Sequence, residues 1–432
     1  MEVPGFRAVA EAELEKPTAQ RKLLAGILFI TIFVAYMDRV NVSVLVADDT
    51  FLTMMGIKGQ PIQMGMLMTA FLIAYGIANV LFSPVGDYLG PRKAMSLSIL
   101  LWGVSLLIGG FAPVFGALVF SRVLLGAGEG MHYPMQSKFV KNWFPPQERG
   151  KANSVWLVGQ SVAPAVAMPF FAYIVVAMGW RPSFFILTAI GIVPLLLVWL
   201  CTTDTPQEHP RINPAELQHI ESGLEKERKQ QAGTETTSLA QSMRVFAYDY
   251  RFWLLVVYYV VHTSVWWGMM TWLPSYLKTA RGFSWTAMGA LSSLPYVLGI
   301  VGKFTGGYLS DKAGRRAPFM AAACVGIAAG IFLGATVENN IASAMLLTLA
   351  IFASSIGVPS GWSMLQDIVP SRVVSTGAGV MNGVANGLSA LAPALIGYFI
   401  SLTGSYKGGL MYLVGLAITG AVASIVLAVK KY

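Results

Sequence analysis

The chain has 432 residues, of which 55% are hydrophobic and only 12% are charged, and its mean hydropathy is positive. A soluble globular chain carries about 25% charged residues, so this composition excludes an ordinary soluble protein and indicates one that crosses a membrane several times. The net charge of +9 is spread over the short loops between apolar spans, which argues against nucleic-acid binding. Cys201 and Cys324 both lie in apolar sequence, so we expect neither a disulfide framework nor a metal site, and no cofactor.

Hydropathy predicts twelve membrane-spanning helices, because the apolar runs are long and continuous rather than alternating as in a β-barrel. The expected spans are 23–45, 62–83, 93–112, 114–137, 152–177, 183–202, 253–277, 287–308, 317–336, 341–364, 374–401 and 408–429.

The first span carries two adjacent charged residues, Asp38 and Arg39. A charge in the middle of a membrane helix costs about 2.5–3.5 kcal/mol on insertion scales, so each residue needs a partner or an aqueous cavity. The planar guanidinium of Arg39 suits the acid group of an anionic substrate, although it could instead pair with a carboxylate of the protein. Neighbouring helix positions point about 100° apart, so Asp38 is a poor partner for Arg39. Asp38 is either a proton carrier or a fixed partner of another helix.

Two similar loops follow the second and eighth spans, "GDYLGPRKA" and "LSDKAGRRA". Asp87 corresponds to Asp311 and Arg92 to Arg316, with an offset of 224 residues in both pairs. An aspartate at the edge of the membrane can cap the N-terminus of a neighbouring helix, so we assign these four residues to a cytoplasmic gate. The repeat predicts two related six-helix bundles with the transport site between them.

The fourth span contains Arg122 and Glu129, which are seven residues apart and therefore share one helix face. The rise between them is about 10.5 Å, which is too far for a direct salt bridge. Glu129 lies in "GAGEG", where glycines permit a close approach of helices. It is either a proton-carrying acid or a permanently paired carboxylate.

One long polar segment divides the spans into six and six. We expect a cytoplasmic leader (1–22), a first bundle (23–202), a cytoplasmic linker (203–252) and a second bundle (253–429). Lys and Arg residues are concentrated on the side of the leader and linker, so the positive-inside rule predicts that both termini are cytoplasmic.

Several uncharged polar and aromatic side chains lie within the apolar spans, where they could bind a hydroxylated substrate or hydrogen-bond between helices. Trp267 could equally face lipid, because its stretch, "VYYVVHTSVWWGMMTW", is rich in aromatic residues. His262 in the same stretch is either a packing residue or a second titratable group. The candidates for substrate contact are Tyr36, Tyr75, Gln160, Trp267, Trp362 and Asn382.

The chain resembles the major facilitator superfamily through its duplicated loops. "YMDRVN", "SRVLLGAGEGMHYP", "NWFPPQERGKA" and "WLPSYL" narrow the resemblance to the anion:cation symporter family, which includes bacterial carriers of galactonate, glucarate and hexuronates. The first loop departs from the superfamily pattern, because Leu89 stands where a basic residue is common. The resemblance implies that Asp38 and Glu129 carry protons and that Arg122 modulates the acid. It also implies sugar-acid contacts for Tyr36, Tyr75, Gln160, Trp362 and Asn382.

Together these observations predict a proton-coupled importer of an organic anion, acting as a monomer in the cell inner membrane by alternating access. A sugar acid such as an aldonate, aldarate or hexuronate is the leading substrate. A dicarboxylate, an aromatic acid or a sulfonate is an alternative substrate, sodium is an alternative coupling ion, and export of drugs or metabolites is an alternative function. The sequence contains no nucleophile–base set, metal cluster or phosphate loop, so we do not expect an enzyme.

Overall fold

The computed structural model describes residues 16–82, 85–231, 244, 246–369 and 374–430. Within this part of the chain the regular structure is helical, and eleven helices are long and apolar enough to cross a membrane. The predicted fourth span (114–137) is missing from that number because it is divided at Met131 into two shorter helices. The structure thus agrees with the all-α membrane fold that the sequence predicts.

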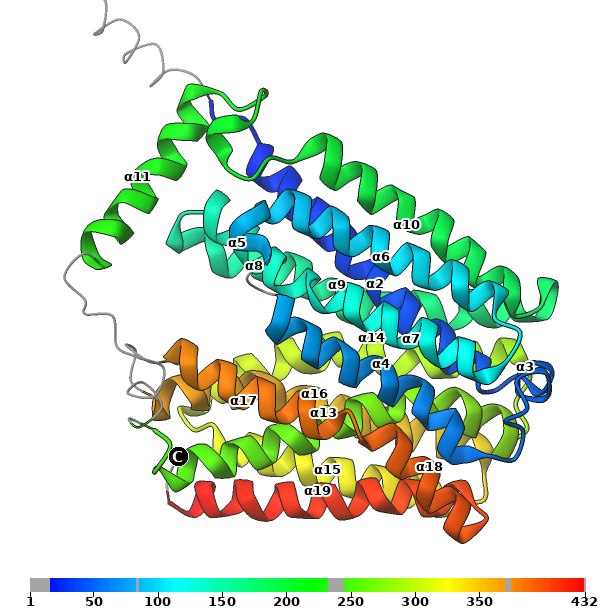
Figure 1. The fold of residues 1–432 in the computed structure, drawn as a ribbon. Helices are drawn as coiled ribbons and strands as arrows, with labels where there is room; N and C mark the ends of the chain where they lie inside the picture. Colours follow the sequence, from blue (N-terminus) through cyan, green and yellow to red (C-terminus); the bar gives the residue numbers. More distant parts are fainter. Residues whose placement is uncertain (1–15, 83–84, 232–243, 245, 370–373, 431–432) are drawn as a thin grey trace, which may run out of the picture.

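The first group of helices runs from the first span to the polar segment, and its members lie on one side of the molecule (Figure 1). They are α2 (Gln20–Leu45), α3 (Asp49–Met54), α4 (Pro61–Phe82), α5 (Val85–Leu89), α6 (Pro91–Phe111), α7 (Phe115–Gly130), α8 (His132–Trp143), α9 (Pro146–Met178) and α10 (Arg181–Cys201).

The second group follows the polar segment, which contains the short turn η1 (Pro206–Glu208) and the helix α11 (Pro214–Gln231). Its members lie on the other side of the molecule (Figure 1). They are α13 (Tyr250–Ser275) with the short π-helix η2 (Tyr276–Ala280), α14 (Trp285–Ala313), α15 (Ala317–Thr336), α16 (Asn340–Ile368), α17 (Val374–Ser389), α18 (Ala392–Thr403) and α19 (Tyr406–Val429).

Glycines let α7 lie directly against α4. A Cβ atom at Gly126 would be 2.3 Å from the carbonyl oxygen of Phe71, and one at Gly130 would be 2.7 Å from that of Tyr75. Any larger residue would separate the two helices. The close approach brings Glu129, which lies between these glycines, to the helices that carry the other candidate site residues.

The two groups of helices touch tightly at the end of the molecule opposite the termini. There a Cβ at Gly65 of α4 would be 2.3 Å from the carbonyl oxygen of Pro393, and one at Gly397 of α18 would be 2.3 Å from that of Pro61. The backbone amide of Ala394 also donates to the hydroxyl of Thr69 at 3.3 Å. This end of the molecule is therefore closed by backbone-to-backbone packing.

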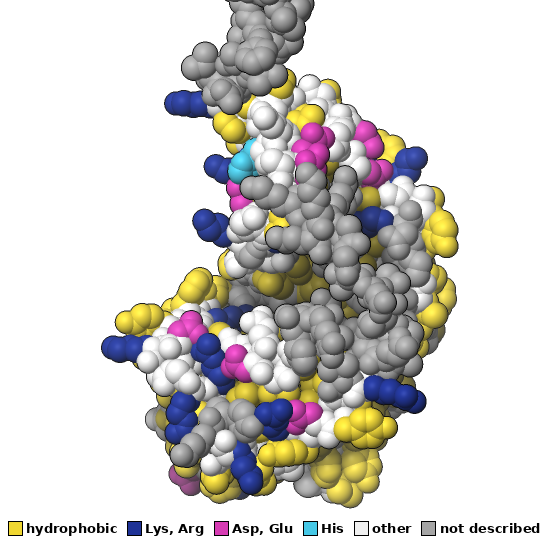
Figure 2. All heavy atoms as spheres, turned by 90° about the vertical axis from the view of Figure 1, so that its left-hand side faces the viewer, with side chains coloured by type: hydrophobic (Ala, Val, Ile, Leu, Met, Phe, Trp, Pro, Cys, Tyr) yellow, Lys and Arg dark blue, Asp and Glu magenta, His cyan; other side chains and the backbone are white. Residues whose placement is uncertain are grey.

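The start of α2 and the end of α19 lie at the same end of the molecule (Figure 1). Figure 2 views this end and shows Lys and Arg side chains distributed around it. Both features fit an even number of crossings with basic residues concentrated on one side of the membrane.

Candidate functional site

Arg39 and Glu129 form a buried ion pair. The guanidinium donates from Nε to Oε2 of Glu129 at 2.8 Å, and its Nη2 lies 2.8 Å from the same oxygen. The two side chains are 2% and 0% exposed. The sequence left open whether Arg39 waits for a substrate or pairs with a carboxylate, and in this conformation it is paired.

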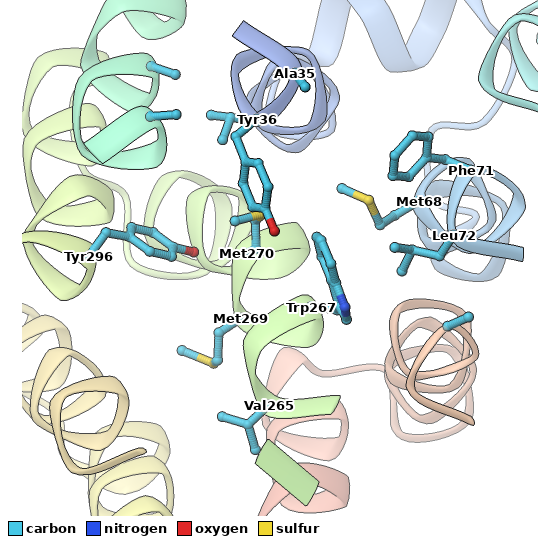
Figure 3. Close-up of a cluster of buried hydrophobic side chains, with 14 of the residues drawn as sticks. Ala35, Tyr36, Met68, Phe71, Leu72, Val265, Trp267, Met269, Met270 and Tyr296 are labelled. Atoms are coloured by element: carbon cyan, nitrogen blue, oxygen red, sulfur yellow. The ribbon is translucent and has the colours of Figure 1, made fainter. Parts of the chain in front are cut away.

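Four aromatic rings surround the Arg39 guanidinium. Its Cζ atom lies 4.3 Å from the ring centre of Tyr36, 4.9 Å from Tyr75, 5.2 Å from Phe71 and 5.6 Å from Trp267. Tyr36 and Trp267 stack with ring centres 6.3 Å apart, although they belong to opposite groups of helices (Figure 3). Ring faces attract cations, so the cluster stabilises a guanidinium that has left water. Trp267 is 5% exposed and therefore faces this cluster, not lipid.

Asp38 and Arg122 interact electrostatically with both members of this ion pair and are equally buried, at 0% and 1% exposed. Within the described part of the chain, neither carboxylate oxygen of Asp38 and neither terminal nitrogen of Arg122 has a hydrogen-bond partner. The Nε atom of Arg122 donates to the carbonyl oxygen of Leu67 at 3.4 Å. Buried ionisable groups without partners are costly, which favours a role for them in transport over a role in stability.

Phe71 contacts both arginines. Its ring centre lies 5.2 Å from Cζ of Arg39 and 4.9 Å from Cζ of Arg122. The ring therefore attracts two like charges at once. Arg122 forms no ion pair with Glu129 among the described residues, as their spacing along α7 predicts.

Three of the predicted substrate contacts gather at Arg39 and three have other neighbours. Tyr36, Tyr75 and Trp267 belong to the ring cluster. Trp362 packs edge-on against Tyr259 with ring centres 5.5 Å apart. Asn382 is exposed and accepts a hydrogen bond of 2.9 Å from Asn386, and Gln160 is half-buried on α9.

The loop residues predicted to form a gate are held in two different ways. Arg92 bonds the carbonyl oxygen of Trp199, and its backbone amide donates to Asp204 at 2.7 Å, so Asp204 caps the start of α6. Arg316 forms an ion pair with Asp311 and lies 3.9 Å from Asp367. The side chain of Asp87 falls outside the part of the chain that the structure describes.

Two further groups of residues were not predicted from the sequence. Lys303 of α14 donates from Nζ to the hydroxyl of Ser161 on α9 at 2.8 Å. Lys303 lies in an apolar span, so the signal that identified Arg39 could have identified it as well.

The second unpredicted group joins the linker to the start of α2. Arg21 lies between Glu148 and Glu216, at 2.8 and 2.9 Å. Glu216, on α11, also accepts from the backbone amides of Gln20 and Arg21 at 3.1 Å each. Nothing in the sequence pairs these distant residues, because the contact depends on how α11 folds back. Among the described residues, no group of three His, Cys, Asp or Glu side chains could hold a metal ion.

Comparison with known proteins identifies the family. The Major Facilitator Superfamily pattern matches residues 28–393. The probable sulfoacetate transporter SauU of Cupriavidus necator is 31% identical over 416 residues, covering 94% of this chain and 93% of that one. The probable galactarate/D-glucarate transporter GudP of Escherichia coli K12 is 29% identical, with 93% and 92% covered, and the hexuronate transporter of Bacillus subtilis is 28% identical, with 92% of each covered.

Solved structures show the same fold. A bacterial homologue of the human lysosomal transporter Spinster, crystallised facing inward and unoccupied, has a TM-score of 0.73 at 18% identity and covers 95% of both chains. The D-xylose-proton symporter has a TM-score of 0.69 at 16% identity, with 94% and 96% covered. The predicted fold of two six-helix bundles and the predicted resemblance to bacterial sugar-acid carriers are both confirmed. The chain belongs to the Major Facilitator Superfamily and is a multi-pass membrane transporter, not an enzyme.

Proposed function

We propose that this transporter imports a small organic anion together with protons, and that Arg39 binds an acid group of the substrate. The observation that carries the proposal is a permanent cation within the apolar spans, enclosed by aromatic rings and held by one carboxylate. The named substrates of the relatives, which are sulfoacetate, galactarate, D-glucarate and hexuronate, support an organic anion as the cargo.

The ion pair suggests how protons and substrate are linked. A proton on Glu129 weakens its hold on Arg39, so the guanidinium becomes free for the substrate's acid group. Loss of that proton lets Glu129 compete for Arg39 again and expel the substrate. Asp38, which lies close to Glu129 and both arginines, is the second proton carrier in this scheme, and Arg122 modulates both acids.

The number of protons that accompany the anion decides whether its import gains from the membrane voltage. Moving one elementary charge through 100 mV is worth about 2.3 kcal/mol, so a monoanion imported with a single proton gains nothing from the voltage. Two proton-carrying acids, Asp38 and Glu129, would let the import of a monoanion gain from the voltage. Import of a dianion would need more than two protons to gain from the voltage. With two protons it is electrically neutral and would use the proton gradient alone.

The closed end of the molecule fits one step of alternating access. With both termini in the cytoplasm, the end closed by Gly65 and Gly397 faces outward. The gate at the other end would then be formed by Asp87, Arg92, Asp311 and Arg316. In this arrangement the polypeptide consists of a leader (1–22), two bundles (23–202 and 253–429) and a linker (203–252), and functions as a monomer in the inner membrane.

Proteoliposomes with a pH-sensitive dye inside provide the test. Aldonates, aldarates, uronates, dicarboxylates, aromatic acids and sulfonates are added outside one at a time, with and without sodium. Internal acidification that a substrate evokes without sodium supports proton-coupled import and gives the chemical class. Sodium-dependent uptake without acidification would reject proton coupling, and no uptake of any anion by folded protein would reject the function.

A further inference from the structure

A third cation within the spans, Lys303, joins the two groups of helices near the Arg39 cluster. Its Nζ atom donates to the Ser161 hydroxyl at 2.8 Å and lies 5.5 Å from the ring centre of Trp266. In the described part of the chain Lys303 forms no ion pair with a carboxylate. A hydroxyl and a ring face compensate only part of the cost of removing an ammonium group from water, so an anionic partner would stabilise Lys303 further.

The surroundings of Lys303 and Arg39 are linked through consecutive residues. Trp266 contacts Lys303 and Trp267 contacts Arg39, and their ring centres lie 5.5 and 5.6 Å from the two cations. Ser161, the partner of Lys303, directly follows Gln160, one of the candidate substrate contacts. Both cations therefore lie at a similar depth along α13, on two adjacent faces of that helix.

The charges within the spans leave room for an anion. Arg39, Arg122 and Lys303 are opposed by Asp38 and Glu129, so the described interior holds one positive charge in excess. A proton on either carboxylate would raise the excess to two. A substrate with two negative charges would then neutralise the interior, and a monoanion would leave one positive charge in excess. With both carboxylates protonated the excess is three, and a dianion again leaves less of it than a monoanion.

We propose that Lys303 binds a second anionic group of the substrate, so that this transporter selects organic dianions with an acid group at each end. The inference rests on the proposed function, because it assigns the other acid group to Arg39. In the conformation described here, the Ser161 hydroxyl holds the Lys303 ammonium in place. The bond joins α9 to α14, so the substrate's second acid group would contact both groups of helices.

The experiment compares matched anions that differ at one end only. Glucarate and gluconate share a six-carbon chain, but only glucarate has an acid group at both ends. Sulfoacetate and methanesulfonate share a sulfonate group, but only sulfoacetate also has a carboxylate. Binding to detergent-purified full-length protein is measured by calorimetry at fixed pH for the wild type, Lys303→Gln, Lys303→Arg and Ser161→Ala. In at least one pair, we expect the wild type to bind the dianion about tenfold or more tightly than the matched monoanion, because the dianion forms one additional ion pair.

The variants separate a binding role from a structural one. Lys303→Gln should lower dianion affinity about tenfold while changing monoanion affinity less than about twofold, because only the second acid group loses its partner. Lys303→Arg and Ser161→Ala should keep the preference for the dianion. A Lys303→Gln variant that lowers the affinity for both anions equally would overturn the inference.

The same data distinguish this inference from the proposed function. If the wild type binds monoanions and dianions equally, the dianion inference fails and anion transport stands. If folded wild type binds no anion of either class, both fail. Should Lys303→Gln not fold, the preference of the wild type still decides the question, since equal affinities would overturn the inference without any variant.

Discussion

Arg39 and Glu129 are joined through a single carboxylate oxygen, because both Nε and Nη2 of the guanidinium approach Oε2 at 2.8 Å while Oε1 has no partner in the described structure. The pair is thus tight at one oxygen and incomplete at the other. A bidentate carboxylate from a substrate would make two such bonds in better geometry. This asymmetry makes the contact suited to exchange between an internal acid and an external one.

Replacing Glu129 by Gln should uncouple the transporter. The amide keeps the shape of the side chain but cannot exchange a proton, so uphill uptake driven by a pH gradient should fall at least about tenfold. Exchange of labelled for unlabelled substrate across the membrane should persist, because exchange needs no net proton movement. If Glu129→Gln accumulates substrate as the wild type does, Glu129 is not a proton carrier.

Arg39 should be required for binding and also for stability. Arg39→Ala leaves Glu129 buried without its partner, which costs about 3–5 kcal/mol when a buried pair is broken, so the melting temperature should fall. The double variant Arg39→Ala with Glu129→Gln removes that uncompensated charge and should recover much of the stability without recovering substrate binding. Recovery of binding in the double variant would show that Arg39 is only a structural partner of Glu129.

Trp267 should contribute through its ring face. Trp267→Leu removes both the stacking on Tyr36 and the contact with Arg39, and a cation–ring contact is worth about 0.5–2 kcal/mol, so we expect substrate affinity to drop several-fold. Trp267→Phe keeps an aromatic face and should lose less. Equal affinities for the Leu and Phe variants, measured by calorimetry, would argue against a role for the ring face.

Closure of the end opposite the termini should depend on Gly65. A leucine there would place its Cβ against the Pro393 carbonyl, so the two groups of helices could not meet and transport should be abolished. Gly76→Leu is the matched control on the same helix, since a Cβ at Gly76 meets nothing within 4 Å. Uptake and melting temperature are measured for both. Normal uptake by Gly65→Leu would show that this contact is not needed for transport.

The linker helix should stabilise the start of α2 through Glu216. This carboxylate is fully buried and holds Arg21 and two backbone amides, so Glu216→Gln should lower the melting temperature by several degrees. Glu221→Gln, on the same helix, removes a carboxylate that accepts a hydrogen bond from Gln207 at an exposed site, and should change the melting temperature little. Similar melting temperatures for the two variants would mean that the Glu216 network adds nothing to stability.

The sequence alone determined the class of fold and the residues of the central ion pair. Apolar runs of about 20 residues have one stable solution in lipid, which is the helix, and charges within such runs are costly enough to mark a site. Asp38, Arg39, Arg122 and Glu129 were all identified in this way, and the duplicated loops indicated two related bundles.

Only the tertiary structure decided which of these groups meet. The register of α2 against α7 pairs Arg39 with Glu129 and leaves Asp38 without a hydrogen-bond partner among the described residues, and hydropathy has no information on that register. The same limit hid the contact of Trp267 with Arg39, the bond from Lys303 to Ser161 and the burial of Glu216 against Arg21. Each of these contacts joins residues 90 or more positions apart, and such contacts depend on how helices pack side by side, which local sequence patterns do not record.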